Sequence, residues 1–583
     1  MSMPRAVFHK YRPGAPPGYM VCQSPVDVLE AWRAGEVLPT LAAVERAVET
    51  GLYAAGFIAY EAAAAFDPAL DVHSSGQTPL AWFALFRDMR PEECLSAAGE
   101  FQLGVWQPSL GRQQYDEAID RIRDYIARGD TYQVNYTFRL RAPFRGDPWP
   151  LFARLCRAQQ ARYAAYIDTG KQVICSASPE LFFRLDGQQL LTRPMKGTAA
   201  RGRSGREDAL QREALTASAK ERAENAMIVD MMRNDLGRVA RRGSVRVLSA
   251  FDVEKYPTVF QMTSTVAAQT SASLVDILRA LFPAASITGA PKVRTMQIIR
   301  QLEPEPRGVY TGCVGYLAPK RRAQFNVAIR TVTIDRAAGQ AEFGVGGGIV
   351  WDSTTAREYA ECRVKAEVLT VHVPQFELLE TLLHEAAEGY FLLEKHLRRL
   401  GESAAYFDFP LDATAVRACL DEHARGLGTG RHRVRLRLSC SGQCSVASTP
   451  LPAQDAARPR RLKLAAAPID SRNVMLHHKT TWREPYEAAY AARDDCDDVV
   501  LWNEHGQVTE TTISNLVIEK AGQRLTPPVA CGLLAGVYRA QLLETDQVRE
   551  AVVTIEDLQR AEKLFVINSV RRCLPAVLVD ESC

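Results

Sequence analysis

The chain carries two sets of chemically active residues in separate stretches, and the change between them near Pro374 constrains the fold most. Paired glutamates, a lysine motif and a glycine run precede this point, and a second lysine with its own acidic partner follows it. With 583 residues, the chain is also too long for one hydrophobic core. We therefore predict an N-terminal segment over 1–110, a catalytic domain over 111–373 and a further domain over 374–583.

Composition narrows the class of function. The formal net charge is +3 and charged residues make up 24% of the chain, so no nucleic-acid footprint is expected. The 13 Cys residues include no Cys-x-x-Cys pair, which argues against structural zinc. No apolar run is long enough to span a bilayer, and the first residues lack the apolar segment of a signal peptide. The expectation is a cytoplasmic protein with neither a membrane nor a nucleic-acid partner.

Four glutamates in two helical patterns predict a metal site. Glu221 and Glu224 lie three residues apart in the first pattern, and Glu358 and Glu361 are spaced in the same way in the second. Positions i and i+3 share one face of a helix, so each pair can direct both carboxylates to one point. Carboxylates gathered in this way repel unless a cation neutralises them, and all-oxygen ligands suit Mg²⁺.

Three further segments have features of anion binding. Residues 286–292 lead into a helix with Pro291 as its first residue, and the free N–H groups at the start of that helix can bind an anion. Arg330 falls on an alternating strand predicted from Phe325 to Ile334, and the glycine run at 344–348 can turn backbone N–H groups towards a carboxylate. Together with the metal, these segments predict a substrate with two carboxylates.

In this order, the motifs resemble the chorismate-utilising family, which includes anthranilate, aminodeoxychorismate, isochorismate and salicylate synthases. Gly129–Asn135, Ser178–Glu180 and Arg233–Gly237 add to the resemblance, which covers roughly residues 110 to 370. Chorismate carries two carboxylates, in agreement with the site inferred from residue types. The resemblance implies chorismate as substrate and an α/β (α+β) chain with two large antiparallel-rich sheets and outer helices.

Lys196 separates the branches of that family. Anthranilate synthases usually have a small residue there, whereas aminodeoxychorismate synthases have lysine. The resemblance implies that Lys196 attacks C2 of chorismate as the C4 hydroxyl leaves, and that ammonia then enters at C4 and expels the lysine. It implies Glu180 as general acid and base. Gln133 stands where isochorismate-type enzymes carry a water-activating lysine, which argues against that branch. The substrate-binding residues implied are Thr198, Gln261, Thr288, Gly289, Tyr310, Arg330, Gly346, Gly347 and Gly348.

The residues after Pro374 offer a different chemistry. Lys479 can form a covalent link to a carbonyl, Glu510 lies in a strand pattern, and Gly536 and Val537 open a helix. Pyridoxal phosphate requires a lysine, an acid beside its pyridine nitrogen and donors for its phosphate.

This second set resembles the fold-type IV pyridoxal-phosphate family, which includes aminotransferases and aminodeoxychorismate lyase. The resemblance implies a two-lobed domain with the cofactor between the lobes. It implies that Lys479 carries the cofactor and then acts as acid and base, that Glu510 pairs with the pyridine nitrogen, and that Arg399, Gly536 and Val537 hold the phosphate. Enzymes of this family commonly dimerise, so a homodimer through this domain is one expectation.

The two halves together predict a bifunctional enzyme of folate synthesis. The first would aminate chorismate to 4-amino-4-deoxychorismate, and the second would eliminate pyruvate to give 4-aminobenzoate. The sequence shows no glutaminase nucleophile elbow or His-x-Glu pair, so a separate glutamine amidotransferase subunit is the expected source of ammonia. Two alternatives stay open, an anthranilate-type synthase fused to an aminotransferase and a synthase with a non-catalytic C-terminal domain. Lys196 argues against the former, and retention of Lys479, Glu510 and Arg399 argues against the latter.

Overall fold

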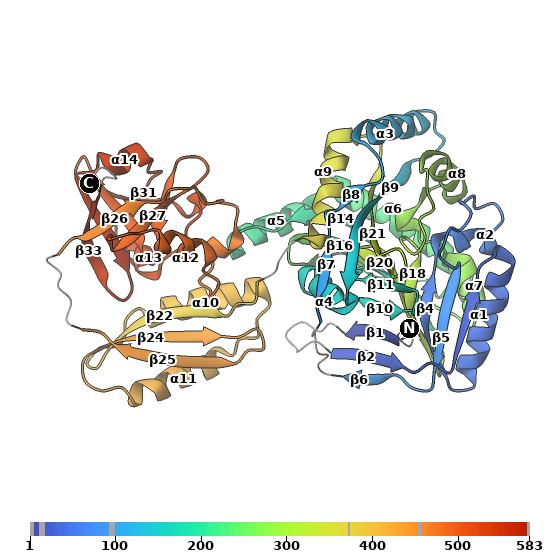
Figure 1. Cartoon of the computed structure of the whole chain (residues 1–583), viewed down its shortest axis with the longest axis horizontal. Coiled ribbons are helices and arrows are strands. Elements are labelled where there is room, and N and C mark those ends of the chain that lie inside the picture. The colour runs from blue at the N-terminus through green and yellow to red at the C-terminus, as the bar shows by residue number, and fades with distance from the viewer. Residues whose placement is uncertain (1–4, 11–17, 93–98, 371–373, 453–457, 580–583) are drawn as a thin grey trace. The chain divides into compact units, whose positions relative to one another are not determined.

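The structure is a computed structural model that describes residues 5–10, 18–92, 99–370, 374–452 and 458–579 (Figure 1). It divides into two compact units. The first holds the described residues up to Arg201 and from Gln211 to residue 370. The second holds those from Pro374 onward together with Gly202–Leu210. Residues 371–373, where the sequence places the end of the catalytic domain, lie outside the described residues.

Two antiparallel sheets form the centre of the first unit. The described strands of the larger sheet follow the order β17 (Gly289–Ala290), β9 (Gln133–Gly146), β21 (Gln340–Ile349), β20 (Thr331–Asp335), β11 (Gln172–Ser176), β10 (Ala165–Asp168), β1 (Arg5–Lys10), β2 (Gly18–Gln23) and β6 (Arg90–Glu92), with β7 (Phe101–Leu103) and β8 (Gln107–Pro108) paired to β9. Those of the other sheet follow the order β14 (Met195–Ala200), β16 (Val259–Gln269), β13 (Gln189–Arg193), β12 (Leu181–Asp186), β19 (Arg322–Val327), β18 (Cys313–Ala318), β4 (Tyr53–Ile58), β5 (Ala81–Phe86) and β3 (Asp27–Ala31), with β15 (Arg246–Lys255) paired to β16.

Helices accompany these sheets. They are α1 (Ala34–Glu49), α2 (Ala63–Phe66), α3 (Arg112–Ala127), α4 (Pro148–Gln159), α6 (Ala219–Gly237), α7 (Leu274–Leu281), α8 (Lys292–Leu302) and α9 (Thr355–Ala366), with the 3-10 turns η1 (Tyr60–Ala62), η2 (Ala285–Ile287) and η3 (Glu367–Leu369). Helix α5 (Gly205–Ala217) begins in the second unit and ends in the first. The predicted class of two large antiparallel-rich sheets with outer helices is confirmed.

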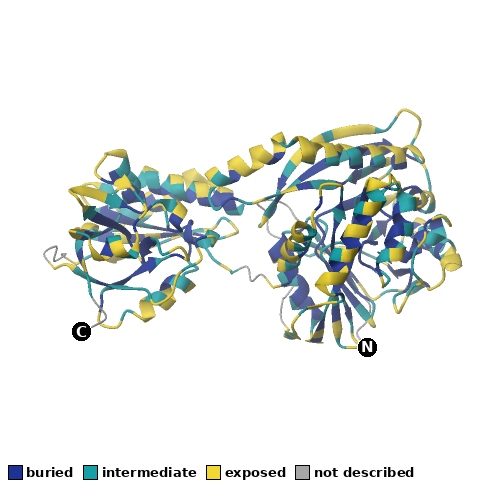
Figure 2. Ribbon diagram, turned by 90° about the horizontal axis from the view of Figure 1, so that it is seen from above, coloured by how far each residue is buried: buried dark blue, intermediate teal, exposed yellow. Residues whose placement is uncertain are grey.

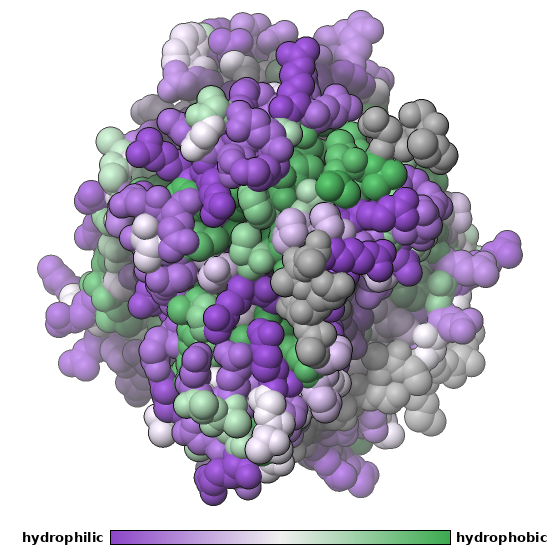
Figure 3. Space-filling view, turned by 90° about the vertical axis from the view of Figure 1, so that its left-hand side faces the viewer, coloured by the Kyte–Doolittle hydropathy of each residue, from purple (hydrophilic) through white to green (hydrophobic). Residues whose placement is uncertain are grey.

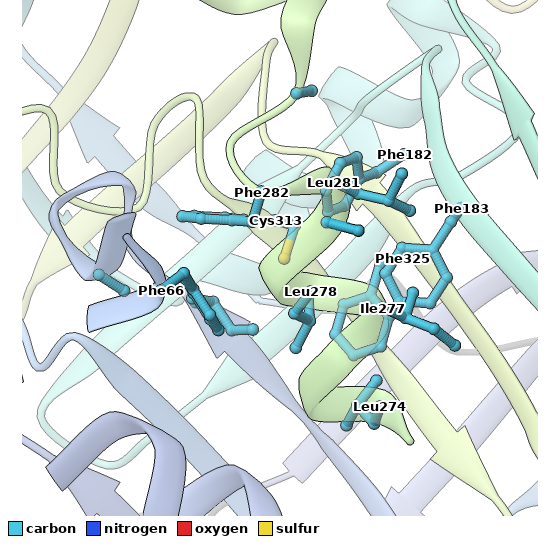
Figure 4. Close-up of a cluster of buried hydrophobic side chains, with 14 of the residues drawn as sticks. Phe66, Phe182, Phe183, Leu274, Ile277, Leu278, Leu281, Phe282, Cys313 and Phe325 are labelled. Carbon is cyan, nitrogen blue, oxygen red and sulfur yellow. The ribbon is translucent and has the colours of Figure 1, made fainter. Parts of the chain in front are cut away.

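Helix α7 illustrates how the core holds a helix against a sheet. Ser273 caps it by accepting a hydrogen bond from the Asp276 N–H at 3.1 Å. Ile277, Leu278 and Leu281 are fully buried in a cluster with phenylalanines of the sheet, as Figure 4 shows. Each such side chain contributes about 1.5–3 kcal/mol when it leaves water.

Two local expectations are wrong. Residues 325–334 do not form one strand, because β19 ends at Val327 and β20 begins at Thr331. Arg330 lies between them with φ of 51°, in the left-handed region. Helix α8 begins at Lys292, so Pro291 is its N-cap rather than its first helical residue.

The second unit contains two sheets of different kinds. The antiparallel one follows the order β23 (Gly389–Tyr390), β22 (Leu378–Glu385), β24 (Arg431–Leu438) and β25 (Cys444–Pro450), and its apolar face packs with α10 (Leu393–Phe407) and α11 (Ala413–Arg425). The mixed one follows the order β28 (Val508–Thr511), β27 (Asp498–Trp502), β26 (Arg460–Leu464), β33 (Arg572–Leu578), β32 (Lys563–Asn568), β29 (Asn515–Lys520), β30 (Gln523–Thr526) and β31 (Arg549–Glu550). The remaining helical elements are α12 (Glu484–Ala491), α13 (Val537–Glu544), α14 (Ile555–Gln559), η4 (Val474–Leu476) and η5 (Val529–Cys531).

Residues 202–210 pack within this second unit. The Tyr406 hydroxyl donates to the Gly202 carbonyl at 2.7 Å, and a guanidinium N–H of Arg203 donates to the Ala530 carbonyl at 3.3 Å. A segment distant in sequence therefore forms part of the second unit's surface.

Burial follows the layers of each unit. Strands in the interior are buried, while helices carry exposed residues along their outer sides (Figure 2). On the face drawn in Figure 3, hydrophilic residues cover most of the surface and hydrophobic residues gather in patches between them. None of the helices described is both long and apolar enough to cross a membrane.

Candidate active sites

One cavity of about 340 Å³ in the first unit brings together most of the residues that the sequence analysis assigns to chorismate. Its walls include parts of β14, β21, α6 and α9. The predicted residues on it are Glu180, Lys196, Thr198, Glu221, Glu224, Gln261, Tyr310, Arg330, Gly346, Gly347, Gly348, Glu358 and Glu361.

Lys196 lies on β14, and its Nζ is 3.2 Å from Glu224 Oε2. Its backbone is held by Asn225, whose Nδ2 donates to the Lys196 carbonyl at 3.0 Å. Ser264 in turn donates to Asn225 Oδ1 at 2.6 Å. A Cβ on Gly348 would lie 3.0 Å from Lys196 Nζ, so the absence of a side chain there leaves room for the amine.

Glu180 is buried, and its Oε1 accepts a hydrogen bond from Ser286 Oγ at 2.7 Å. Burial raises the pKa of Glu180 to about 7, although the Ser286 bond, a backbone bond from Met195 and the nearby Lys196 oppose the increase. The carboxyl group can therefore hold or release a proton near neutral pH, as a general acid and base must.

The four predicted metal ligands come from α6 and α9, as their spacing requires. Burial raises the pKa of Glu221, and the negative charge of Glu224 adds to the increase. Burial also raises the pKa of Glu358, with a further contribution from Glu361. Negative charge is thus concentrated on one wall of the cavity.

Lysines already neutralise part of this charge. Lys365 Nζ lies 2.7 Å from Glu361 Oε1, and Lys196 forms an ion pair with Glu224. In this arrangement no three His, Cys, Asp or Glu among the described residues are placed to hold a metal ion together. The four carboxylates that share the cavity offer the oxygen ligands that Mg²⁺ prefers, but Glu224 and Glu361 would have to leave Lys196 and Lys365 to bind the ion.

Arg330 and the glycine strand supply the positive side of the cavity. An N–H of Arg330 donates to the Lys365 carbonyl, and burial lowers the pKa of Arg330 to about 10, so the guanidinium stays charged at neutral pH. Gly346 lies in β21 opposite β9, where a Cβ would be 2.2 Å from the Tyr136 carbonyl oxygen. Only glycine fits that position.

Thr288 and Gly289 do not line the cavity. Thr288 is fully buried and donates its hydroxyl to the Ala284 carbonyl at 3.2 Å, and Gly289 pairs with Val134 of β9. The start of α8 is also absent from the lining, and Lys292 is paired there with Asp235 at 3.0 Å.

Sequence reasoning missed several residues that the structure places at the site. Asn225, Ser286 and Lys365 hold Lys196, Glu180 and Glu361 respectively. Ser286 had been assigned to the anion-binding segment 286–292 rather than to Glu180. Of the other two, only Lys365 had a readable signal, because it follows Glu361 by four residues on one helix.

A second cavity, of about 200 Å³, lies between the two sheets of the second unit. Leu379 and Thr381 come from the antiparallel sheet, and Asn515 and Ile567 come from the mixed one. All five residues predicted for pyridoxal phosphate line this cavity: Lys479, Glu510, Arg399, Gly536 and Val537.

Burial shifts the pKa of both Lys479 and Glu510 towards neutral pH. Burial lowers the pKa of Lys479 to about 8, and Arg399 adds to the decrease. Burial raises the pKa of Glu510 to about 7. Glu510 accepts hydrogen bonds from the Tyr486 hydroxyl at 2.8 Å and from the Leu534 N–H at 3.0 Å, which fix its carboxyl group in place.

The predicted phosphate end is built around the start of α13. Gly536 is its N-cap, and a Cβ there would lie 1.9 Å from Asn515 Oδ1, so a side chain is excluded. Arg399 donates to Glu380 at 2.6 and 2.9 Å and to the Ala535 carbonyl at 3.1 Å, which places its guanidinium beside this turn. These residues fit pyridoxal phosphate.

Two families match the chain in succession. Residues 20–371 match the chorismate binding enzymes, and residues 377–579 match amino-transferase class IV. The chain therefore belongs to the chorismate binding enzymes and carries a C-terminal class IV aminotransferase domain.

Individual proteins that are similar to this chain give a more specific comparison than the family models. Aminodeoxychorismate synthase component 1 of Klebsiella aerogenes is 46% identical over 259 residues, which cover 44% of this chain and 57% of that protein. Anthranilate synthase component 1 of Thermus thermophilus is 40% identical over 274 residues, covering 47% and 59%. The chain thus spans little more than half the length of these curated relatives. The solved anthranilate synthase component I from Streptococcus pneumoniae TIGR4 shares the fold, with a TM-score of 0.53, 24% identity and coverage of 61% of this chain and 92% of that one.

Proposed function

We propose that the chain makes 4-aminobenzoate from chorismate in two reactions. The first unit replaces the C4 hydroxyl of chorismate with an amino group from ammonia, which yields 4-amino-4-deoxychorismate and water. The second unit eliminates pyruvate from that product. The observation that carries the proposal is the amine of Lys196 in the same cavity as Glu180. This lysine decides the branch, because the relatives include both aminodeoxychorismate and anthranilate synthases.

In the first reaction, Lys196 Nζ attacks C2, the two ring double bonds shift, and the bond from C4 to the hydroxyl breaks. Glu180 gives its proton to the departing oxygen, so water leaves. Ammonia then attacks C4, the double bonds return, and the bond between C2 and Lys196 breaks. Arg330 and the glycine strand bind one carboxylate of chorismate. Mg²⁺ on Glu221, Glu224, Glu358 and Glu361 would neutralise the other.

In the second reaction, pyridoxal phosphate, when bound, supplies an electron sink. Lys479 takes the proton from C4 of the ring, since its lowered pKa of about 8 leaves part of the amine unprotonated near neutral pH. The bond from C3 to the enolpyruvyl oxygen breaks, the ring becomes aromatic, and a proton added to the enol carbon gives pyruvate. Glu510 would pair with the pyridine nitrogen, while Arg399 and the start of α13 would hold the phosphate.

A separate glutamine amidotransferase would supply the ammonia. The relative from Klebsiella aerogenes is named as component 1 of its synthase, which supports the existence of a second component. The purified chain should use ammonium and not glutamine. Equal rates with the two nitrogen sources would remove the need for this partner.

Product analysis tests the whole proposal. Chorismate, Mg²⁺, ammonium and pyridoxal phosphate should give 4-aminobenzoate with the wild type and 4-amino-4-deoxychorismate with Lys479→Ala. Lys196→Ala should give neither product but should still convert supplied 4-amino-4-deoxychorismate. Anthranilate as the wild-type product, or 4-aminobenzoate from Lys479→Ala, would show that the assignment of that half is wrong.

A further inference from the structure

Strand β24 presents a row of arginines on one face. Arg431, Arg433, Arg435 and Arg437 alternate with buried residues that pack towards α10 and α11. Side chains two apart on a strand point to the same side of the sheet, so the four guanidinium groups share the face opposite these helices.

Ion pairing divides this row into two kinds of arginine. At its ends, Arg431 lies 3.1 Å from a Glu385 oxygen and Arg437 lies 3.7 Å from a Glu377 oxygen. In its middle, the guanidinium groups of Arg433 and Arg435 make neither an ion pair nor a hydrogen bond with any residue that the structure describes. Arg433 and Arg435 line the cavity of Lys479, whereas the paired arginines do not.

Arg571 brings a third unpaired guanidinium to this cavity. It lies between β32 and β33 and likewise makes no side-chain hydrogen bond or ion pair within the described ranges. Burial lowers the pKa of Arg571, and Arg460 and Arg433 add to the decrease, while Asp497, which is paired with Arg460, opposes it. Burial lowers the pKa of Arg435 as well, with Arg433 and Arg437 adding to it. The guanidinium groups therefore repel one another.

The acidic residues nearby do not balance this charge. Glu510 is held by the Tyr486 hydroxyl and backbone, and Glu380 is committed to Arg399 and to His396, whose Nδ1 is 2.7 Å from it. Unpaired arginines in a half-enclosed cavity are stabilised when an anion binds, and a planar guanidinium pairs best with a carboxylate or a phosphate.

We propose that Arg433, Arg435 and Arg571 form an anion subsite beside Lys479, and that the amine substrate of the second unit carries two carboxylates. This inference rests on the proposed function for the amine, and it deepens that function by assigning the residues that bind the anionic groups. 4-Amino-4-deoxychorismate meets the requirement with its ring and enolpyruvyl carboxylates. A monocarboxylic amino acid, the substrate of many aminotransferases, would leave part of the positive charge unbalanced.

The subsite is tested by comparing the binding of isophthalate, an aromatic ring with two carboxylates, with that of benzoate, which has one. Binding to the full-length holoprotein is followed by the absorbance of pyridoxal phosphate, because the first unit is also expected to bind dicarboxylates and this signal reports only on the Lys479 cavity. Isophthalate should bind at least about tenfold more tightly than benzoate. Arg433→Gln and Arg435→Gln should each weaken the binding of isophthalate by about tenfold, because each variant loses a charge-assisted hydrogen bond to a carboxylate.

Arg437→Gln is the matched control, because it removes an arginine from the same strand face that already has a partner. It should bind isophthalate as the wild type does. Equal affinities for isophthalate and benzoate, or equal losses in Arg435→Gln and Arg437→Gln, would overturn the proposal. Loss of pyridoxal phosphate with unchanged preference for isophthalate would also overturn it and would assign the arginines to the cofactor.

Two further comparisons separate the subsite from the reaction. Calorimetry on the cofactor-free protein should show an isophthalate-binding event that Arg433→Gln weakens by about tenfold and Arg437→Gln leaves unchanged, beside any binding to the first unit that both variants keep. A titration of Arg433→Gln identical to that of the wild type overturns the subsite. If dicarboxylate binding depends on these arginines but 4-amino-4-deoxychorismate is not consumed, the subsite stands and the proposed lyase reaction fails. If both subsite variants consume 4-amino-4-deoxychorismate at an unchanged KM, the lyase reaction stands and the subsite fails.

Discussion

At the scale of the residue, both candidate sites contain a buried glutamate that can hold a proton near neutral pH. Glu180 and Glu510 each have a pKa raised to about 7 by burial. Their surroundings differ, because Glu180 accepts from one serine hydroxyl beside a lysine, whereas Glu510 is fixed by tyrosine, backbone and amide donors. The surroundings of Glu180 suit a group that gives up its proton, whereas those of Glu510 suit a group that is held in a fixed position.

The proton on Glu180 predicts the pH dependence of chorismate amination. The rate should fall as pH rises through about 7, because the acid form that protonates the leaving hydroxyl is lost above the pKa. Ser286→Ala removes a hydrogen bond that favours the charged form, so the pKa should rise and the decline should move to higher pH. Initial rates at a fixed concentration of un-ionised ammonia check this expectation. A decline at the same pH in both proteins would contradict it.

At the scale of the element, helices were predictable and turns were not. The three-residue spacing of the glutamates correctly predicted helices α6 and α9, because the helical period is a local property. Arg330 was assigned to a strand, yet its positive φ depends on how β19 and β20 enter different sheets, which no local pattern reveals. The ion pair between Lys196 and Glu224 was also hidden, since it joins a strand to a helix.

Strand β21 allows a test of the space around Lys196. Gly348→Ala should lower chorismate amination by about 100-fold, because the new Cβ would lie 3.0 Å from Lys196 Nζ and 2.8 Å from Gln133 Nε2 and would displace the amine. Gln340→Ala is the control on the same strand, since that side chain is exposed and does not line the cavity. Steady-state rates of the two variants make the comparison. Similar losses would show that displacement of Lys196 is not the cause.

Helices α6 and α9 allow a test of the metal site. Glu221→Gln and Glu358→Gln should each weaken Mg²⁺ binding by at least about tenfold, because each removes one charged oxygen ligand. Asp230→Asn is the control on α6, as that side chain is exposed and paired with Arg233. The Mg²⁺ concentration that gives half-maximal amination is the quantity to compare. An unchanged requirement in both glutamine variants would rule out these carboxylates as ligands.

At the scale of the whole molecule, each unit has hydrophobic clusters of its own. One large cluster joins α1, α7 and the strands around Phe325, whereas others lie between β24 and its helices or within the mixed sheet. The sequence predicted the change of chemistry near Pro374 because the motifs on each side differ. It could not predict that residues 202–210 pack with the second unit, because that assignment depends on contacts such as Tyr406 with Gly202.

Separate clusters predict two thermal transitions. Pyridoxal phosphate should raise the Tm of one transition, and chorismate with Mg²⁺ should raise the other, because each ligand stabilises only the unit that binds it. A ligand at 100 times its Kd adds about 2.7 kcal/mol. Scanning calorimetry of the wild type and of Lys479→Ala makes the test, and the variant should lose most of the shift with pyridoxal phosphate. A single transition that both ligands raise would show that the units unfold together.

Helix α5 has a consequence for how such a chain can arise or be divided. Its first residues belong to one unit and its last to the other, so the polypeptide crosses between units there as well as near Pro374. A recombination event at one position near Pro374 would leave residues 202–210 with the wrong partner. One cut near Pro374 therefore does not separate the two units cleanly, and either unit expressed alone is expected to lose or expose this segment.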